Sequence, residues 1–210
     1  MTKIILIRHG ESLGNIQKIF LGHTDWDLTE RGYEQAKKMA RYIDNFDIDV
    51  IYASDLKRAY NTAKEVAKRR NMDIIKTKEF REIFAGEWEG KSYAELDEKY
   101  PEARKCWGED IGNAVCTGGE SVKELQNRVV KEFYRIAEEN KGKTVLIGTH
   151  ATPIRMIKCH VSGKKTEDAK DIPWALNASA TIIDVEKNEI ILDGYAEYLG
   201  DFLVAPSAKM

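Results

Sequence analysis

The fold is decided by a short aliphatic run, Lys3-Ile4-Ile5-Leu6-Ile7-Arg8, and by the polar sequence His9-Gly10-Glu11-Ser12 that follows it. An apolar run of this length is typical of a buried strand. The polar residues continue to Leu28 without steady helical spacing, so we expect residues 9–28 to form a loop. A loop that follows directly from a buried strand is a common setting for functional residues.

Beyond this loop, segments with helical spacing alternate with short aliphatic runs. We expect helices over residues 29–46, with Thr29 as the N-cap, and over residues 55–70. Strands are expected over residues 49–53 and 72–77. Strands that alternate with helices predict βαβ units, and therefore an α/β fold.

Residues 84–118 break this rhythm, with aromatic side chains set among glycines, short helical signals and Pro101. We expect this segment to be a cap inserted into a single domain that spans residues 1–210. The aromatic residues of the segment include Trp88, Tyr93, Tyr100 and Trp107.

After the predicted cap, the chain returns to alternating helices and strands. Ser121 and Glu124 have the spacing of a capping box, which predicts an amphipathic helix that ends at Gly142. Further along, the pattern predicts a strand over 143–149, a helix over 151–161, and a hairpin in which strands 181–186 and 189–193 flank Lys187-Asn188.

The composition indicates a globular protein whose partner is a small molecule. The 210 residues include 33 basic and 35 acidic side chains, a formal net charge of -2, and 42% hydrophobic residues. This charge lacks the positive footprint of a nucleic-acid binder, and no apolar run approaches the ~20 residues that cross a bilayer. The apolar run at residues 4–7 is too short for a secretory signal, so we expect a cytoplasmic protein. Three cysteines without a CxxC pair are expected to stay reduced.

Two histidines stand where predicted strands end. His9 follows the first strand, and His150 follows the strand over 143–149. Ligands bind at the carboxyl ends of the strands in an open α/β sheet, so we expect the two histidines to meet there. Arg58, in the helix after the second strand, and Glu82, just before the cap, can reach the same crevice.

These residue types suit the transfer of a phosphoryl group. A neutral imidazole can attack phosphorus, and guanidinium groups bind the charged oxygens of the transferring group. A second, protonated histidine adds positive charge, and a carboxylic acid can protonate the leaving oxygen and later take a proton from water. This scheme requires no metal and no cofactor, and its partner is a small phosphomonoester.

The same residues lie in motifs that resemble those of the histidine phosphatase superfamily, which includes the cofactor-dependent phosphoglycerate mutases. The resemblance implies a three-layer α/β/α sandwich with a mostly parallel central sheet and an inserted cap. It covers most of the chain, in the family's order: Leu6-Ile7-Arg8-His9-Gly10-Glu11-Ser12 with Asn15, Leu28-Thr29-Glu30-Arg31-Gly32, Ser54-Asp55-Leu56-Lys57-Arg58-Ala59, Arg81-Glu82-Ile83 with Gly86-Glu87-Trp88-Glu89-Gly90, Gly119-Glu120-Ser121, and Thr149-His150.

By this resemblance, His9 is the phosphorylated nucleophile and Glu82 is the proton donor. The implied catalytic set is His9, Glu82, His150, Arg8 and Arg58, and the implied phosphate- or substrate-binding residues are Arg8, Asn15, Arg58, His150, Gly22, His23 and Ala151. The family usually places glycine after its second histidine. If that position needs a positive φ, Ala151 is disfavoured there, and weaker activity is expected.

Three functions are possible, and they differ in what happens to the phosphoryl group. Water makes a phosphatase and a retained monophosphoglycerate makes a mutase, whereas a chain that holds a phosphoester without releasing phosphate is a binding module. Residues 84–118 carry eight acidic and four basic side chains, a net charge of -4, which disfavours the bisphosphate that a mutase must hold. We therefore expect a phosphatase. Trp88, Tyr93 and Trp107 can shelter an apolar leaving group or simply pack the cap, and the oligomeric state stays open, with a homodimer as one option.

Overall fold

A six-stranded sheet forms the centre of the protein in the computed structural model, which describes residues 1–203. The predicted single domain also includes residues 204–210, which lie outside the described residues. In the sheet the strands follow the order β4-β3-β6-β1-β7-β8. The first four of these are parallel, β7 runs antiparallel to β1, and β8 runs antiparallel to β7. The strands are β1 (Lys3–Arg8), β3 (Val50–Ser54), β4 (Ile74–Thr77), β6 (Thr144–Thr149), β7 (Ala180–Asp184) and β8 (Glu189–Tyr195).

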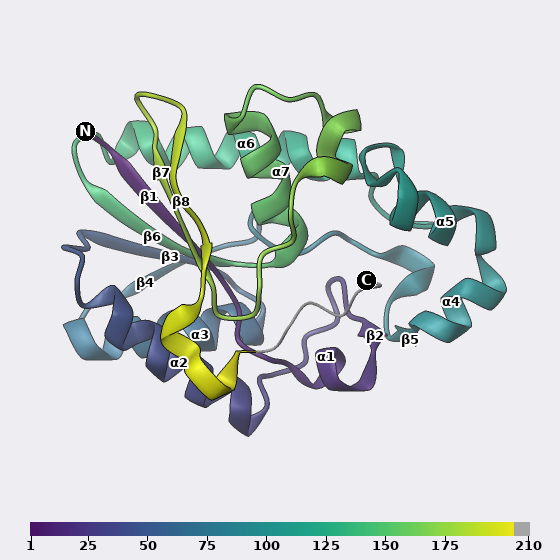
Figure 1. Ribbon diagram of the computed structural model, residues 1–210, viewed down its shortest axis with the longest axis horizontal. Helices are drawn as coiled ribbons and strands as arrows, with labels where there is room; N and C mark the ends of the chain where they lie inside the picture. The colour runs from purple at the N-terminus through teal and green to yellow at the C-terminus, as the bar shows by residue number, and fades with distance from the viewer. Residues whose placement is uncertain (204–210) are drawn as a thin grey trace.

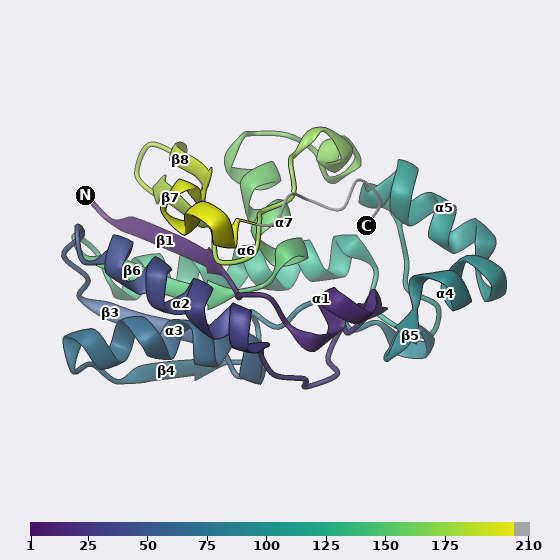
Figure 2. The same cartoon turned by 60° about the horizontal axis from the view of Figure 1, so that its bottom comes forward.

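Helices cover both faces of this sheet, as Figures 1 and 2 show. On one face lie α2 (Glu30–Ile43) and α3 (Lys57–Arg70), and on the other lie α6 (Val122–Glu139) and α7 (Ala151–Val161). Successive residues of β1 point to opposite faces, so Ile4 and Leu6 join the α6 and α7 core while Ile5 and Ile7 join the α2 and α3 core. A strand that is covered on both sides is uniformly apolar, which explains the aliphatic run. The predicted three-layer α/β/α sandwich is confirmed.

The prediction of a loop over residues 9–28 was incomplete. It holds the short helix α1 (Leu13–Gln17) and the two-residue strand β2 (Ile19–Phe20). Ser12 and Asn15 form a capping box for α1, in which asparagine replaces the usual glutamate or glutamine. A helix of five residues has too few turns to leave a periodic pattern, so this box is its one signal in the sequence.

Three other predicted elements form with small differences. The Ser121 and Glu124 capping box is present at the start of α6, which ends at Glu139, before the predicted end at Gly142. α7 has the predicted bounds. The β7 and β8 hairpin also forms, but residues 185–188 connect its strands, because Asp184 pairs directly with Glu189.

The segment predicted as a cap projects beyond one end of the sheet (Figure 1). It holds β5 (Lys91–Ser92), α4 (Tyr93–Lys99), α5 (Pro101–Glu109) and two short 3-10 helices, Gly86–Trp88 and Ile111–Asn113. Strand β5 pairs with β2. Phe20 of β2 packs edge-on against Trp88 and Trp107, at ring-centroid distances of 5.4 and 5.1 Å. These contacts fasten the segment to the loop that follows β1.

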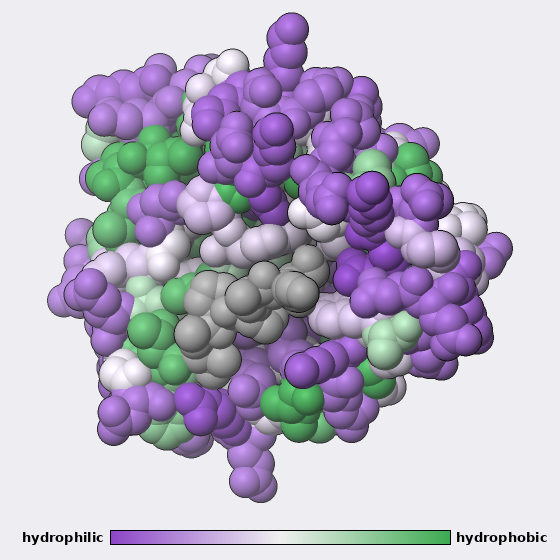
Figure 3. Space-filling model, turned by 45° about the vertical axis from the view of Figure 1, so that its right-hand side comes forward, coloured by the Kyte–Doolittle hydropathy of each residue, from purple (hydrophilic) through white to green (hydrophobic). Residues whose placement is uncertain are grey.

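The face that carries this segment is largely hydrophilic, with apolar side chains in small separate groups (Figure 3). Among residues 1–203, no helix combines the length and the apolar character needed to cross a membrane. The same residues contain no cluster of three or more His, Cys, Asp or Glu side chains that could hold a metal ion. The cytoplasmic location and the homodimer stay predictions.

Candidate active site

His9 and His150 meet at the carboxyl end of the sheet. Strands β1 and β6 are parallel neighbours in which Arg8 pairs with Thr149, so the next residue of each strand stands at the same level. The two imidazole rings lie 5.3 Å apart, measured between centroids, at an interplanar angle of 60°. The register of two strands therefore brings together the two histidines that the sequence singled out.

The ring of His9 is buried and is oriented by its own turn. Its Nδ1 lies 2.7 Å from the carbonyl oxygen of Gly10. A carbonyl oxygen can only accept, so the hydrogen belongs on Nδ1 and the lone pair on Nε2. Burial lowers the pKa of His9 well below its usual value, and the charges of Arg58 and Arg8 lower it further. His9 is therefore neutral at physiological pH, as a nucleophile must be.

His150 is the N-cap residue of α7 and is wholly buried. Its Nε2 lies 2.9 Å from the hydroxyl of Ser54, at the end of β3. Its Nδ1 has no hydrogen-bond partner within residues 1–203. Burial lowers the pKa of His150 well below its usual value, and the positive charge of Arg58 adds to this effect. His150 is therefore neutral in the free protein, and a protonated second histidine stays a prediction for the substrate-bound state.

Arg8 and Arg58 are each held by backbone carbonyls through part of the guanidinium group. Arg8 donates from Nη1 to the carbonyl of Ala175 at 2.6 Å, and its buried Nε lacks a partner in the described part of the chain. Arg58, in the first turn of α3, donates from Nη1 and Nη2 to the carbonyls of Thr24 and Gly22 at 2.8 and 2.7 Å. Burial lowers the pKa of Arg58 to about 10, so the group stays charged at neutral pH. Both arginines keep further N–H donors for an anion.

Glu82 approaches the histidines from the segment before the cap. Its Oε2 accepts a hydrogen bond from the backbone N–H of Thr152 at 3.3 Å, in the first turn of α7, and its Oε1 accepts from the N–H of Ile83 at 2.8 Å. The backbone carbonyl of Glu82 accepts from His23 Nε2 and from Arg128 Nη2, both at 2.9 Å. Both ends of the residue are therefore fixed beside the helix terminus.

The remaining predicted site residues divide into two groups. Asn15, Gly22 and Ala151 line the pocket, whereas His23 does not and instead supports the backbone of Glu82. Gly22 has a φ of +50°, and a Cβ there would lie 2.3 Å from an oxygen of Glu89, so only glycine fits. Ala151 is the first residue of α7 and does not have a positive φ. The reason for expecting weaker activity from alanine at this position is therefore absent.

The site contains a pocket of about 530 Å³, measured with its open mouth. We use the name polar floor for Arg8, His9, Arg58 and His150, with exposed fractions of 5%, 5%, 1% and 0%. His9 and Arg58 form part of the pocket wall, and Arg8 and His150 lie buried next to them. The floor thus gathers two cations and two neutral imidazoles out of water, where their interactions with an anion are strongest.

Aromatic side chains also line the pocket. We call Tyr93, Trp107 and Trp174 the aromatic rim, and all three line the pocket with Ile19 and Leu21. The sequence singled out the first two of the rim but missed Trp174, which lies in a stretch without a motif. Trp88, which the sequence also offered as a shelter for a leaving group, is wholly buried and packs the cap, with its Nε1 donating to Thr117 Oγ1 at 3.2 Å.

Comparison with known proteins identifies the family. The family model described as "Histidine phosphatase superfamily (branch 1)" matches residues 4–197. The chain belongs to this superfamily. It is 36% identical over 209 residues to "Phosphoserine phosphatase 1" of Hydrogenobacter thermophilus, which covers 97% of each chain. It is 29% identical over 165 residues to "Adenosylcobalamin/alpha-ribazole phosphatase" of Escherichia coli, which covers 79% of this chain and 81% of the relative.

Solved structures of other proteins share this fold. YhfR of Bacillus stearothermophilus superposes with a TM-score of 0.90 at 26% identity, covering 95% of this chain and 100% of the other. Mycobacterial glucosyl-3-phosphoglycerate phosphatase Rv2419c, in complex with VO3, superposes with a TM-score of 0.80 at 25% identity, covering 87% and 92%. The resemblance seen in the motifs therefore extends to the architecture of almost the whole chain.

Proposed function

We propose that this histidine phosphatase superfamily enzyme hydrolyses phosphomonoesters through a phosphohistidine on His9, with Glu82 as the proton donor. The observation that carries the proposal is the state of His9. Its ring is neutral, its Nδ1 is engaged by the Gly10 carbonyl, and it lines a pocket together with the cationic side chain of Arg58. Nε2 is then the nitrogen that attacks phosphorus.

The polar floor would stabilise the charge that develops on the phosphoryl oxygens. Arg8 and Arg58 offer N–H donors that their backbone anchors leave unused. The unpartnered Nδ1 of His150 offers a third group that can hydrogen-bond to the phosphoryl oxygens. Because a phosphate dianion favours the protonated ring, His150 would take up a proton when substrate binds, and would then supply the positive charge expected of the second histidine.

Glu82 would move the protons of both chemical steps. In the first step, Nε2 of His9 forms a bond to phosphorus while the bond to the leaving oxygen breaks, and Glu82 gives its proton to that oxygen. In the second step, water attacks phosphorus, the nitrogen–phosphorus bond breaks, and Glu82 takes a proton from the water. The proposed products are an alcohol or phenol and inorganic phosphate, and the enzyme returns to its starting state.

Water is the proposed acceptor because the pocket offers little to a second charged group. A bisphosphate intermediate would need cations beyond the polar floor, and Arg58 is the one cationic side chain on the pocket wall among the described residues. The cap segment adds a net charge of -4. These features favour a phosphatase over a mutase.

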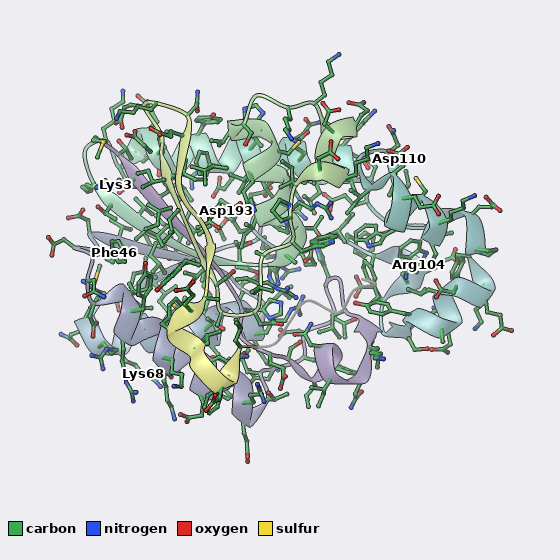
Figure 4. All side chains as sticks on the ribbon, in the orientation of Figure 1. Lys3, Phe46, Lys68, Arg104, Asp110 and Asp193 are labelled. Atoms are coloured by element: carbon green, nitrogen blue, oxygen red, sulfur yellow. The ribbon has the colours of Figure 1, made fainter. Side chains whose placement is uncertain are left out.

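The aromatic rim favours an uncharged, apolar leaving group. Aromatic side chains gain most by covering apolar surface and offer no countercharge to a carboxylate. Arg104, which Figure 4 labels in the cap, packs against Tyr93, 5.3 Å from the ring centroid to its guanidinium carbon, and donates to Asp97 at 3.0 Å. The guanidinium of Arg104 is thus already paired with the carboxylate of Asp97. We therefore expect aryl phosphates to be better substrates than phosphoserine, the substrate in the name of one relative.

The test is phosphate release from a panel of monoesters in the presence of EDTA, with p-nitrophenyl phosphate, 1-naphthyl phosphate, phosphoserine and 3-phosphoglycerate. Acid-quenched enzyme should be trapped with a phosphoryl group on His9, and the aryl esters should give the highest kcat/KM. Mutase turnover that 2,3-bisphosphoglycerate stimulates would overturn the choice of water as acceptor. Bound ester without phosphate release would identify a binding module, and a higher kcat/KM for phosphoserine would overturn the apolar leaving group.

A further inference from the structure

The segment 174–179 connects the 3-10 helix Thr166–Asp171 to β7. It lies directly against residues 8–15, which we call the nucleophile turn. The backbone N–H of Arg8 donates to the carbonyl of Ser179 at 3.1 Å, and the side chain of Arg8 donates to the carbonyl of Ala175 at 2.6 Å. The N–H of Ala178 donates to the carbonyl of His9 at 3.1 Å. No motif in the sequence marks this segment, yet it touches two residues of the polar floor.

Asn177 makes the most unusual contacts in this segment. Its half-buried side-chain Nδ2 lies 3.1 Å from the carbonyl oxygen of His9, 3.3 Å from that of Gly10 and 3.2 Å from Oδ1 of Asn15. All three neighbours are acceptors, so the nitrogen end of the amide must face them. The two hydrogens of one amide are thus shared among three oxygens of the nucleophile turn.

The first consequence concerns the carbonyl of Gly10. This oxygen accepts from Nδ1 of His9 at 2.7 Å and so decides which ring nitrogen carries the hydrogen. The N–H of Gly10 donates to Thr62 Oγ1 at 3.0 Å, which fixes the other side of the same turn. Asn177 therefore contacts the group that keeps Nε2 of His9 bare, although it does not touch the ring.

The second consequence concerns the amide of Asn15, which lines the pocket. Its Oδ1 accepts from the N–H and the hydroxyl of Ser12, both at 3.0 Å, and from Asn177. Because three donors converge on the oxygen, the amide cannot flip without losing all of them. Its Nδ2 is then the end left to face an anion in the pocket.

The residue that follows Asn177 has an unusual backbone conformation. Ala178 has a φ of +51°, a conformation that non-glycine residues rarely adopt. Its N–H is bonded to His9, and its carbonyl accepts from the hydroxyl of Tyr198. Strained residues that surrounding contacts hold in place are typical of functional sites.

We propose that Asn177 is a positioning residue of the active site. It holds the Gly10 carbonyl, and through it the reactive tautomer of His9, and it turns the Asn15 amide so that a nitrogen faces the phosphoryl group. This inference rests on the proposed function, because it assigns Asn177 to the preparation of the nucleophile.

The test uses Asn177→Ala, which removes the donor, and Asn177→Asp, which keeps the shape but places an oxygen among three oxygens. Tyr198→Phe is the matched control, since it loosens the same segment at Ala178 without touching His9, Gly10 or Asn15. The measurements are the His9 tautomer in the free enzyme by nitrogen NMR of the imidazole, the single-turnover rate of phosphohistidine formation, and inhibition by vanadate.

We expect both Asn177 variants to lose phosphorylation rate by roughly 10- to 100-fold. The signal of the Nδ1–H tautomer should weaken, and vanadate should bind less tightly. Tyr198→Phe should melt at a lower temperature but keep the wild-type tautomer and rate. An unchanged tautomer or an unchanged vanadate affinity in the Asn177 variants overturns the proposal, and so does an equal loss of rate in Tyr198→Phe.

These outcomes are distinguishable from a failure of the proposed function. The tautomer is read in the free enzyme and does not depend on turnover. Absence of phosphohistidine in the wild type would count against the proposed function alone, whereas a wild type that forms phosphohistidine beside variants with unaltered tautomers would count against Asn177 alone.

Discussion

The polar floor is charged, buried and tied to the backbone by hydrogen bonds, whereas the aromatic rim of the same pocket makes few polar contacts and comes from two separate segments. Floor residues stand at the ends of β1 and β6 or in the first turn of α3, so the sheet itself fixes their geometry. Rim residues belong to the cap and to the segment before β7. The difference suggests a division of labour in which the floor carries out the chemistry and the rim selects the leaving group.

Replacing the nucleophile should have the largest effect. His9→Ala removes the nitrogen that bonds to phosphorus, so kcat should fall by at least about 10³-fold for every ester, because no neighbouring side chain replaces a covalent nucleophile. The measurement is steady-state phosphate release, with His160→Ala as the control, because His160 lies exposed on α7 away from the pocket. Substantial residual turnover in His9→Ala would place the nucleophile elsewhere.

Glu82→Gln should separate the substrates by their leaving groups. An alkyl alcohol needs a proton as it departs, so kcat for a simple alkyl phosphate should fall by roughly 10²- to 10⁴-fold. Nitrophenolate leaves without one, so the loss for p-nitrophenyl phosphate should be much smaller as long as phosphorylation limits the rate. The comparison is made by single-turnover kinetics on both esters. Equal losses would contradict the role of Glu82 as an acid.

The floor and the fold around it could be predicted from the sequence because they depend on local patterns. The aliphatic runs before His9 and before His150 predict buried strands, and parallel neighbours place the residues after them at one edge. The helix of α7 was predicted in full, because Pro153 in a first turn marks a helix start and does not interrupt it. The sequence therefore predicts the site residues that lie on regular helices and strands or directly after them.

The residues that could not be predicted are those whose position depends on tertiary contacts. Asn177 and Trp174 lie between elements, and only the pairing of β7 with β1 brings their segment to the site. The protonation of His150 also depended on burial that no sequence pattern reports. Trp88 had the same sequence signal as Trp107, and only the packing distinguishes a core residue from a residue of the pocket.

Weakening the rim should change selectivity while leaving the chemistry intact. Trp174→Ala removes the indole from the pocket wall. If about 55 Å² of apolar contact with a bulky leaving group is lost, kcat/KM for 1-naphthyl phosphate should fall by roughly 10-fold, given ~25 cal/mol per Å² of apolar area. For ethyl phosphate, which is too small to reach the rim, the change should stay within about 2-fold. Trp174→Phe is the control and should recover most of the loss. A uniform loss across esters would mean that Trp174 supports the floor through Arg8 and Ala175.

The smallest effect is on stability, and it separates the floor from the rim because only the floor contains buried imidazole rings. Burial, followed by the charge of Arg58, lowers the pKa of His9 and of His150 in the folded protein. The unfolded chain keeps the ordinary histidine pKa of about 6.5. Below that pH the unfolded state therefore binds more protons than the folded state, so the free energy of unfolding must fall as the pH is lowered.

Each of the two rings should contribute a slope of up to about 1.4 kcal/mol per pH unit between the unfolded and the folded pKa. Urea unfolding at several values from pH 7.5 to 5 should show the wild type losing stability more steeply than the double variant His9→Asn/His150→Asn, which has no ring to protonate. Trp174→Ala should keep the wild-type slope even if its overall stability is lower. If the double variant has the same slope as the wild type, the two histidines are not held neutral by the fold, and the lone pair of His9 would then have to be freed by substrate binding.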